Sequence, residues 1–486
     1  MGLSRGPPPM TAPSQAEQLA RIEARLIAAP DKVELIYLRA GLLAELGRDE
    51  AARAGYLAAL ALEPTHFGAL NDLGTLLYRT DFRAAARTAY AEAVKHHPDN
   101  PIGHINLANA LLADGQAQTA RDHFETALSL APDHPDAHQG LANLLQDLGE
   151  ATAAEVHRQK SYARRGVIAL PYRGQGPPCR VLVLVSAVGG NVPTRFLFDD
   201  ALFAVHLLPV EAQAELGDLP EHDLVFNAVG DVDLCGEALE AVEVVLARTQ
   251  RPVINRPEAV RLTGRAAIAQ RMTGLPGLIA PRVESVPRET LRQAARRFGY
   301  PLLLRSPGYH TGRHFHRIED AAGLNAALAD LPGRQLLMID YLDARDAEGH
   351  ARKYRVMMID GTLYPLHLAM AADWKVHYFT ADMAERPDHR ALEAAFLADM
   401  AAVLGPRAMA ALDAVAARLG LDYAGIDFGL NADGDLLLFE ANATMVVNPP
   451  DADPRWDYRR EPVARILAAA QAMMLRRGGL GATPAT

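Results

Sequence analysis

Three oxygen-bearing side chains near the C-terminus have the types and spacing of a metal site. Asp427 is expected at the inner end of one apolar strand, and Glu440 and Asn442 at the end of a second strand after a tight Asn-Ala-Asp-Gly turn. This pattern predicts a hairpin. Residues two apart on a strand share a face, so Glu440 and Asn442 should point together, with Asp427 beside them. Such oxygen donors suit Mg²⁺ that also holds nucleotide phosphates. An ordinary hairpin with solvated acids is the alternative, but a buried unpaired acid is costly.

This arrangement resembles the metal-binding end of the ATP-grasp family, which includes D-alanine–D-alanine ligase, glutathione synthetase and the RimK-type amino-acid ligases. The resemblance covers about residues 179 to 475. It implies that Asp427, Glu440 and Asn442 hold one or two Mg²⁺ ions, with Mn²⁺ as a possible substitute, and that the nucleotide is ATP.

The same resemblance implies a set of nucleotide-binding residues. Arg265 and Arg305 stand where the family commonly has phosphate-binding lysines, and Arg keeps the charge without being interchangeable with Lys. In a chain with 44 Arg and five Lys, drift in composition can account for both replacements. A glycine-containing loop and an adenine-binding hinge follow. The implied nucleotide ligands are Arg265, Arg305, Gly308, His310, Gly312, Asp340, Tyr341, Leu342 and Asp343.

Lys375 and Arg355 are the candidates for catalysis. Lys353 and Lys375 are the lysines that remain after residue 165, so a compact ammonium is expected to matter at one of them. Lys375 lies where the family places a cation towards the transferring phosphate, whereas Lys353 is expected at an exposed strand edge. Arg355 resembles the family's arginine near the acyl phosphate. A salt bridge from Arg355 to a surface acid is the alternative.

Short apolar runs at residues 180–187, 204–210, 223–229 and 252–255 alternate with helical segments. This order predicts an open α/β sheet with ligands at the carboxyl ends of its strands. Two loops leave that edge, and the resemblance implies that this subdomain helps to bind substrate, which makes Gly190, Asn191, Asn227 and Asp231 the substrate-binding candidates. The alternative is that these are ordinary glycine-rich turns.

The N-terminal third is a repeat array. Pro30, Pro64, Pro98 and Pro132 are each 34 residues apart, the period of tetratricopeptide repeats. Small and aromatic packing residues recur at the same period. They are Ala40, Ala52, Tyr56 and Ala59, then Gly74, Ala86, Tyr90 and Ala93, then Ala108, Ala120, Phe124 and Ala127.

Polar residues on the first helices of these repeats predict a peptide-binding groove. Asn71, Asn109 and Asn143 are expected there, and their amides could pair with the backbone of an extended peptide. A solvated polar surface is the alternative. His104 and His138 are expected to be solvated, since they have no Cys or carboxylate at metal-ligand spacing.

The expected architecture is multidomain: an all-α repeat solenoid followed by an α/β ATP-grasp module with an α+β lid. The repeats are placed at 15–165, a linker at 166–178, a first α/β subdomain at 179–255 and the ATP-grasp domain at 256–475. Within the last, the lid covers about 256–342 and the magnesium-binding part about 343–475. A disordered tail is expected at 476–486.

Composition excludes several classes of function. The net charge is −10 with no basic tract, which argues against nucleic acid, and no apolar run reaches the length of a membrane span. Two cysteines fit the reducing cytoplasm. The resemblance also leaves a homodimer open.

The expected activity is that of a carboxylate–amine ligase that forms an amide through an acyl phosphate made from ATP. Its substrates would be a small-molecule carboxylate and an amine, with the repeats recruiting a peptide or protein. Two alternatives remain: a kinase that phosphorylates a small acceptor, and a non-catalytic scaffold with a degenerate ATP-grasp domain.

Overall fold

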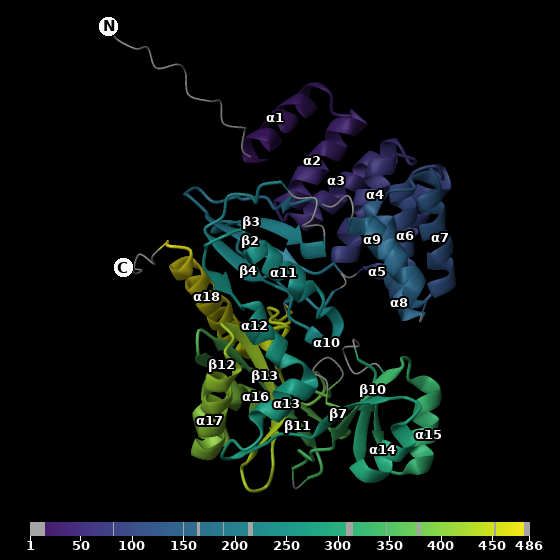
Figure 1. Cartoon of the computed structure of the whole chain (residues 1–486). Helices are drawn as coiled ribbons and strands as arrows, with labels where there is room; N and C mark the ends of the chain where they lie inside the picture. Colours follow the sequence, from purple (N-terminus) through teal and green to yellow (C-terminus); the bar gives the residue numbers. More distant parts are fainter. Residues whose placement is uncertain are drawn as a thin grey trace. The chain divides into compact units, whose positions relative to one another are not determined.

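The chain forms two compact units, Met1–Arg164 and Arg165–Thr486, shown as a ribbon in Figure 1. A computed structural model describes residues 15–80, 82–148, 150–162, 166–187, 189–211, 217–307, 314–346, 348–376, 381–451 and 453–480. A helical array is followed by an α/β region with three sheets, so the expected fold class is confirmed.

The first unit consists of consecutive antiparallel helix pairs that stack along the chain. A single helix precedes the first pair, and each pair packs against the next. The helices are α1 (Gln15–Ala28), α2 (Val33–Glu45), α3 (Asp49–Leu62), α4 (Phe67–Arg79), α5 (Arg83–His96), α6 (Pro101–Ala113), α7 (Ala117–Leu130), α8 (Pro135–Asp147) and α9 (Ala151–Tyr162).

The periodic small and aromatic residues form the core of this unit. All of them are buried, as the repeat pattern predicts. Gly74 shows why the small residues are needed, because a Cβ there would lie 2.6 Å from the Tyr90 ring. The close approach of α4 and α5 therefore depends on the missing side chain.

Two histidine pairs, each with one buried and one half-buried ring, occupy equivalent places in the last two repeats. His104 Nδ1 lies 3.0 Å from His123 Nδ1, and His138 Nδ1 lies 2.9 Å from His157 Nδ1. The Nε2 atoms of His104 and His138 bond the carbonyl oxygens that precede each repeat. The expectation that His104 and His138 are solvated is therefore wrong, because neighbouring helices cover them.

The earlier repeats have apolar or small residues at these positions: Ile36 with Gly55, and Leu70 with Ala89. The histidine pairs thus replace core contacts with a single shared hydrogen bond. Burial lowers the pKa of His123, His138 and His157, and in His123 and His157 the partner imidazole lowers it further. The folded state therefore binds protons less readily than the unfolded chain.

We predict that acid loosens the later repeats selectively. A folded-state pKa below the unfolded value of about 6.5 gives stability that is present above that pH and lost as the pH falls below it. Hydrogen exchange of the full chain should show α6–α9 losing protection between about pH 7.5 and 5, with α2–α5 changing less. The double variant His104→Leu/His123→Ala, which introduces the residues of the second repeat, should reduce the difference. Equal pH dependence in all repeats would contradict the prediction.

The second unit begins with a five-stranded sheet in the order β1-β3-β2-β4-β5, in which β1 is Ile168–Ala169. Strands β2 (Cys179–Val185), β3 (Phe203–Pro209), β4 (Leu224–Asn227) and β5 (Val253–Ile254) are parallel, which confirms the expected open sheet. Helices α10 (Val232–Cys235), α11 (Ala238–Leu246), α12 (Pro257–Val260) and the 3₁₀ turn η2 (Arg261–Thr263) complete this part. Cys179 and Cys235 are free and buried.

A second sheet is antiparallel, in the order β7-β10-β8-β9. Its strands are β7 (Val283–Pro287), β8 (Leu302–Arg305), β9 (Phe315–Ile318) and β10 (Gln335–Asp340). Helices α14 (Leu291–Phe298) and α15 (Ala321–Asp330) pack with it around a separate apolar core.

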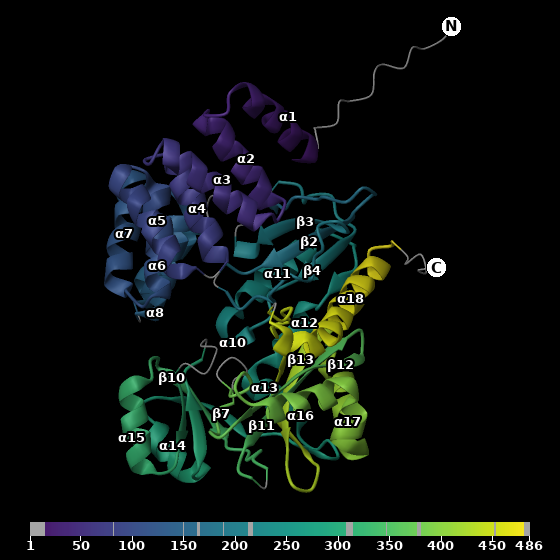
Figure 2. The same cartoon turned by 180° about the vertical axis from the view of Figure 1, so that it is seen from behind.

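The third sheet, in the order β12-β11-β13-β14-β6, carries the candidate metal ligands. Its strands are β6 (Leu278–Ile279), β11 (Ala351–Ile359), β12 (Thr362–Ala371), β13 (Tyr423–Leu430) and β14 (Leu436–Asn442). Figure 2 shows the helices beside it: α13 (Arg265–Met272), α16 (Pro387–Ala398), α17 (Met400–Leu419) and α18 (Arg460–Arg477), the last preceded by η4 (Pro454–Arg459).

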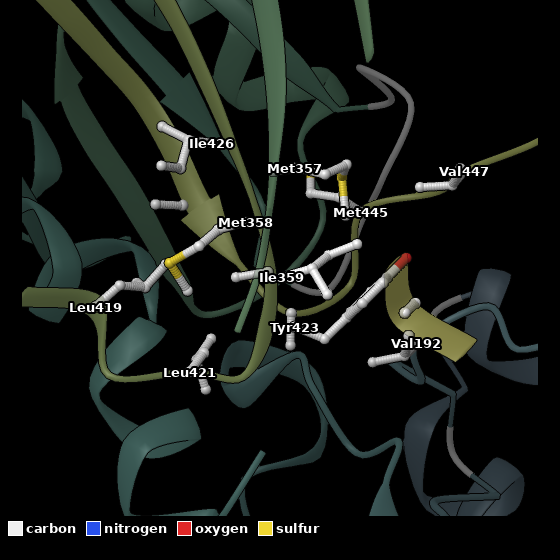
Figure 3. Close-up of a cluster of buried hydrophobic side chains, with 14 of the residues drawn as sticks. Val192, Met357, Met358, Ile359, Leu419, Leu421, Tyr423, Ile426, Met445 and Val447 are labelled. Atoms are coloured by element: carbon white, nitrogen blue, oxygen red, sulfur yellow. The ribbon is translucent and has the colours of Figure 1, made fainter. Parts of the chain in front are cut away.

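Among the described residues, α17 is long and apolar enough to cross a membrane by length and composition. It is kinked at Gly405, and Leu412 and Val415 on its buried face belong to the core of the second unit. The helix thus has the features of a core helix. Figure 3 shows part of that core, where Met357 and Met445 lie side by side. A Cβ at Gly425 would lie 2.6 Å from Met445 Cβ, so the glycine allows this contact.

The structure adds detail within three of the expected segments. The linker at 166–178 includes β1 (Ile168–Ala169), which pairs with β3 as an antiparallel edge strand. Within the expected lid at 256–342, β6 pairs with β14 of the third sheet, and the antiparallel sheet begins only at Val283. Two-residue strands leave no pattern in the sequence, so neither pairing could be predicted from it. At the C-terminus, α18 extends to Arg477, and residues 481–486 of the expected tail lie outside the described part.

Candidate functional site

The three candidate metal ligands share one face of the third sheet. Asp427 on β13 lies directly opposite Glu440 on β14, and Asn442 lies opposite Gly425. Directly opposed residues of an antiparallel pair project from the same face. Asp427 is the fifth residue of β13, in the middle of the strand and not at its inner end.

A β-bulge sets this geometry. Phe428 pairs with Leu438, yet the next residue, Asp427, pairs with Glu440, so Phe439 is the extra residue. A bulge resets the alternation of side chains along one strand. Because of this bulge, Glu440, which follows the buried leucines of β14, projects from the same face of the sheet as Asp427.

Asp427 is buried and paired with two cations from β11. Arg355 donates to both of its carboxylate oxygens, at 2.5 and 2.7 Å, and Lys353 Nζ lies 3.2 Å from Oδ2. Burial opposes ionisation, but Arg355 and then Lys353 outweigh it, so the pKa of Asp427 lies well below its usual value. The alternative in which Arg355 bonds a surface acid is therefore excluded.

The expectation that Lys353 lies at an exposed strand edge is wrong. Strand β11 is an interior strand between β12 and β13, and only 16% of the Lys353 side chain is exposed. The scarcity of lysine in this half of the chain already indicated that Lys353 could have a specific role.

Glu440 is paired with Arg265, the first residue of α13. Arg265 Nη2 donates to Glu440 Oε1 at 2.9 Å, and Nη1 donates to Asp233 Oδ2 at 2.8 Å. In Asn442, Oδ1 accepts from the backbone N–H and the hydroxyl of Thr444. Asp233 lies in the short helix α10, two residues after the predicted Asp231, but its pairing with Arg265 was not predicted.

The three candidate metal ligands and their partners Arg265, Lys353 and Arg355 line a cavity of about 360 Å³. Its described lining contains six cationic side chains and three acidic ones, an excess of three positive charges in a chain with a net charge of −10. The charged lining residues are Arg265, Arg305, Arg352, Lys353, Arg355, Lys375, Asp340, Asp427 and Glu440. Such a cavity suits a ligand with several negative charges.

An aromatic and aliphatic wall forms another part of the cavity. Trp374 makes edge contacts with Phe315 and Tyr341, at ring-centroid distances of 5.3 and 6.4 Å. Lys375 Nζ donates to the Phe315 carbonyl at 3.5 Å, which places the ammonium beside this wall. Apolar lining residues include Val283, Leu303, Ile339, Leu342 and Val446.

The expected nucleotide-binding residues are distributed as follows. Arg305, Asp340, Tyr341 and Leu342 line the cavity with Arg265. Burial and then the nearby Arg265 lower the pKa of Arg305 to about 10, so it stays cationic at neutral pH. Asp343 is outside the lining and pairs with Arg345 at 2.5 Å. Gly308, His310 and Gly312 lie outside the described residues.

The four expected substrate residues are not in the cavity lining. Asn191 exchanges two hydrogen bonds with the Ser186 backbone, and Asn227 donates to the Asn255 carbonyl. The Gly190 carbonyl accepts from Gly230 and Asp231, which joins the two loops. Their polar groups thus hold the loops together. Asp231 has a link to the site, because its carboxylate lies 4.0 Å from Arg265 Nη1.

The three candidate groove residues of the first unit differ in exposure. Asn109 and Asn143 are exposed and lie one repeat apart on α6 and α8. Asn71 is half-buried, accepts from Asn106 at 2.7 Å and donates to Asp72 at 3.1 Å. Its amide therefore contributes to contacts between repeats.

Comparison with known proteins identifies the first unit. The tetratricopeptide repeat model matches residues 71–135 and 105–157, so this unit is a tetratricopeptide repeat array. A search of curated sequences gives no match.

Similar solved structures include MamA of Desulfovibrio magneticus RS-1, at 22% identity over 30% of this chain and 83% of that one, with a TM-score of 0.28. PilF of Pseudomonas aeruginosa is 21% identical over 31% and 69%, with a TM-score of 0.30. YrrB, described as a tetratricopeptide repeat protein with an unusual peptide-binding site, is 18% identical over 29% and 72%, with a TM-score of 0.27.

We predict that Arg355→Met destabilises the second unit by about 3 kcal/mol, because it removes the bidentate partner of a buried carboxylate. Both tryptophans of the chain lie in this unit, so urea unfolding followed by tryptophan fluorescence reports on it. The control Arg407→Met removes the exposed partner of Asp435 and should cost less than about 1 kcal/mol. Equal effects of the two substitutions would contradict the prediction.

Proposed function

We propose that the second unit is an ATP-dependent carboxylate–amine ligase, and that the repeat array binds a peptide or protein that supplies or accompanies a substrate. The observation that carries the proposal is the joining, in one cavity, of the oxygen trio with six cations. The resemblance to ATP-grasp ligases gives this combination its interpretation.

The donor chemistry fits a divalent ion. Asp427, Glu440 and Asn442 present two carboxylates and a carboxamide from neighbouring strands, the oxygen ligands that Mg²⁺ prefers. All three side chains line the cavity. Each of the two acids is paired with a cation, Asp427 with Arg355 and Glu440 with Arg265. Bound Mg²⁺ would supply positive charge at the phosphate oxygens.

The rest of the lining fits an adenine nucleotide. The aliphatic residues and the aromatic wall suit a flat apolar base, while the cations suit the phosphates. Arg305 and Lys375 line the same cavity and would offset negative charge on the transferring phosphoryl group. The backbone at Tyr341 and Leu342 would contact the base edge.

The reaction would proceed in two balanced steps. A carboxylate oxygen of the substrate attacks the γ-phosphorus of ATP, the bond to the bridging oxygen breaks, and ADP leaves an acyl phosphate behind. The amine nitrogen then attacks the acyl carbon and expels phosphate, losing a proton as the amide forms. Arg355 would lie beside the acyl phosphate, where it can stabilise charge on its oxygens.

The repeat array would provide the second function. Tetratricopeptide repeats bind proteins or peptides through extended concave surfaces, and the exposed amides of Asn109 and Asn143 can donate and accept along a backbone. We also propose that the protein works in the reducing cytoplasm, since its two cysteines are free and buried.

We predict magnesium-dependent binding of adenine nucleotide. In a Trp456→Phe background, Trp374 is the single tryptophan and lines the cavity, so its fluorescence should change when ATP and Mg²⁺ are added together. Asp427→Asn and Glu440→Gln should weaken this response at least roughly tenfold, as expected for lost metal ligands. Asp435→Asn is the matched control, because Asp435 lies on the same hairpin but pairs with Arg407.

The reaction itself is tested by incubating the full chain with ATP, Mg²⁺ and candidate peptides or amines. A product whose mass equals two substrates minus water, formed with ADP and phosphate, supports the ligase. A product heavier by a phosphoryl group would indicate a kinase. Unaltered nucleotide binding in Asp427→Asn, or activity without a divalent ion, would refute the proposal.

A further inference from the structure

Arg265 bridges carboxylates from two segments that are far apart in the sequence. One guanidinium nitrogen contacts Asp233 of α10 and another contacts Glu440 of β14, at 2.8 and 2.9 Å. Only 11% of the Arg265 side chain is exposed. One carboxylate oxygen of Glu440, a candidate metal ligand, is therefore held by a cation of the protein itself.

The surroundings of Arg265 hold it in this place. It is the first residue of α13, and its backbone N–H lies 3.3 Å from the Asp233 carboxylate. Asp231 adds a third carboxylate at 4.0 Å. Burial disfavours the charged guanidinium, but Glu440, Asp231 and Asp233 outweigh it and raise the pKa of Arg265. Arg305 also lies near these three acids, but Arg265 is the cation that bonds Asp233 and Glu440 directly.

We propose that Arg265 is a placeholder cation, which neutralises Glu440 while no metal is bound and releases it when the metal and nucleotide enter. The inference rests on the proposed metal site. Asp233 is the positioning residue, since it holds one side of the guanidinium while the other side exchanges Glu440 for a phosphate oxygen.

The chemistry of arginine suits this role better than that of lysine. A guanidinium presents separate N–H groups to two acceptors at once, whereas an ammonium is a single point charge on a flexible chain. Asp427 is already neutralised by Arg355 and Lys353, both from its neighbouring strand. Glu440 receives its cation from Arg265 on α13, through the carboxylate oxygen Oε1.

The test measures Mn²⁺ binding to the nucleotide-free full chain by electron paramagnetic resonance. If Arg265 competes with the ion for Glu440, Arg265→Gln should bind Mn²⁺ roughly tenfold more tightly than the wild type, as expected when a close charge pair is removed. Arg265→Lys should fall between the two, because one ammonium cannot bridge both acids. Far-UV circular dichroism and tryptophan-monitored melting establish that each variant is folded.

Arg352→Gln is the matched control. Arg352 lines the same cavity, but it pairs with Asp346 at 2.8 Å. Its removal changes the cavity charge by the same amount and should alter Mn²⁺ affinity less than about twofold.

The outcomes separate this inference from the function on which it rests. Equal Mn²⁺ affinity in wild type and Arg265→Gln would overturn the placeholder role and leave the metal site intact. An equal shift of Mn²⁺ affinity in Arg352→Gln would also overturn the placeholder role. Wild-type Mn²⁺ affinity in Arg265→Lys would do the same, since either result would show that the affinity depends only on the charge of the cavity. Absence of Mn²⁺ binding in every variant would overturn both the placeholder and the metal site.

Discussion

The buried ion pair between Asp427 and Arg355 is the constraint on which the second unit depends. A carboxylate that is 3% exposed in the middle of a sheet is tolerable only with a partner, and Arg355 satisfies both of its oxygens. The ladder between β11 and β13 places the two residues directly opposite each other. The next strand adds Glu440 to the same row, and α13 supplies the cation for that acid. Each acid of this row that lines the cavity is thus balanced by a cation of the protein itself.

Much of this could be predicted from the sequence because the local patterns are strong. The 34-residue period specifies the helix pairs, and each apolar run in residues 180–255 becomes a strand. The spacing of Glu440 and Asn442 indicates a shared face once a hairpin is assumed. These predictions depend on periodicity or on neighbours in the chain, which a single sequence displays directly.

What could not be predicted depends on contacts between distant segments. Lys353 was expected to be exposed because nothing local shows that β11 lies between two other strands. The bridge from Arg265 to Asp233 and Glu440 joins three segments that the chain alone does not connect. The contact between His104 and His123 is similar, because the two residues lie on different helices. Their pairing becomes evident only when this repeat is compared with the earlier repeats, which have apolar or small residues at the same positions. Asn227 illustrates the reverse error, because a polar residue at a strand end can hold the fold rather than a ligand.

The scarcity of lysine has a practical consequence for the second unit. Its only side-chain amines belong to Lys353 and Lys375, and both line the same cavity. Amine-selective acylating reagents will therefore modify the side chains of this unit at two residues, both of which line the cavity. The extent of that labelling becomes a footprint of whatever occupies the cavity, and it can be mapped by mass without any engineered reporter.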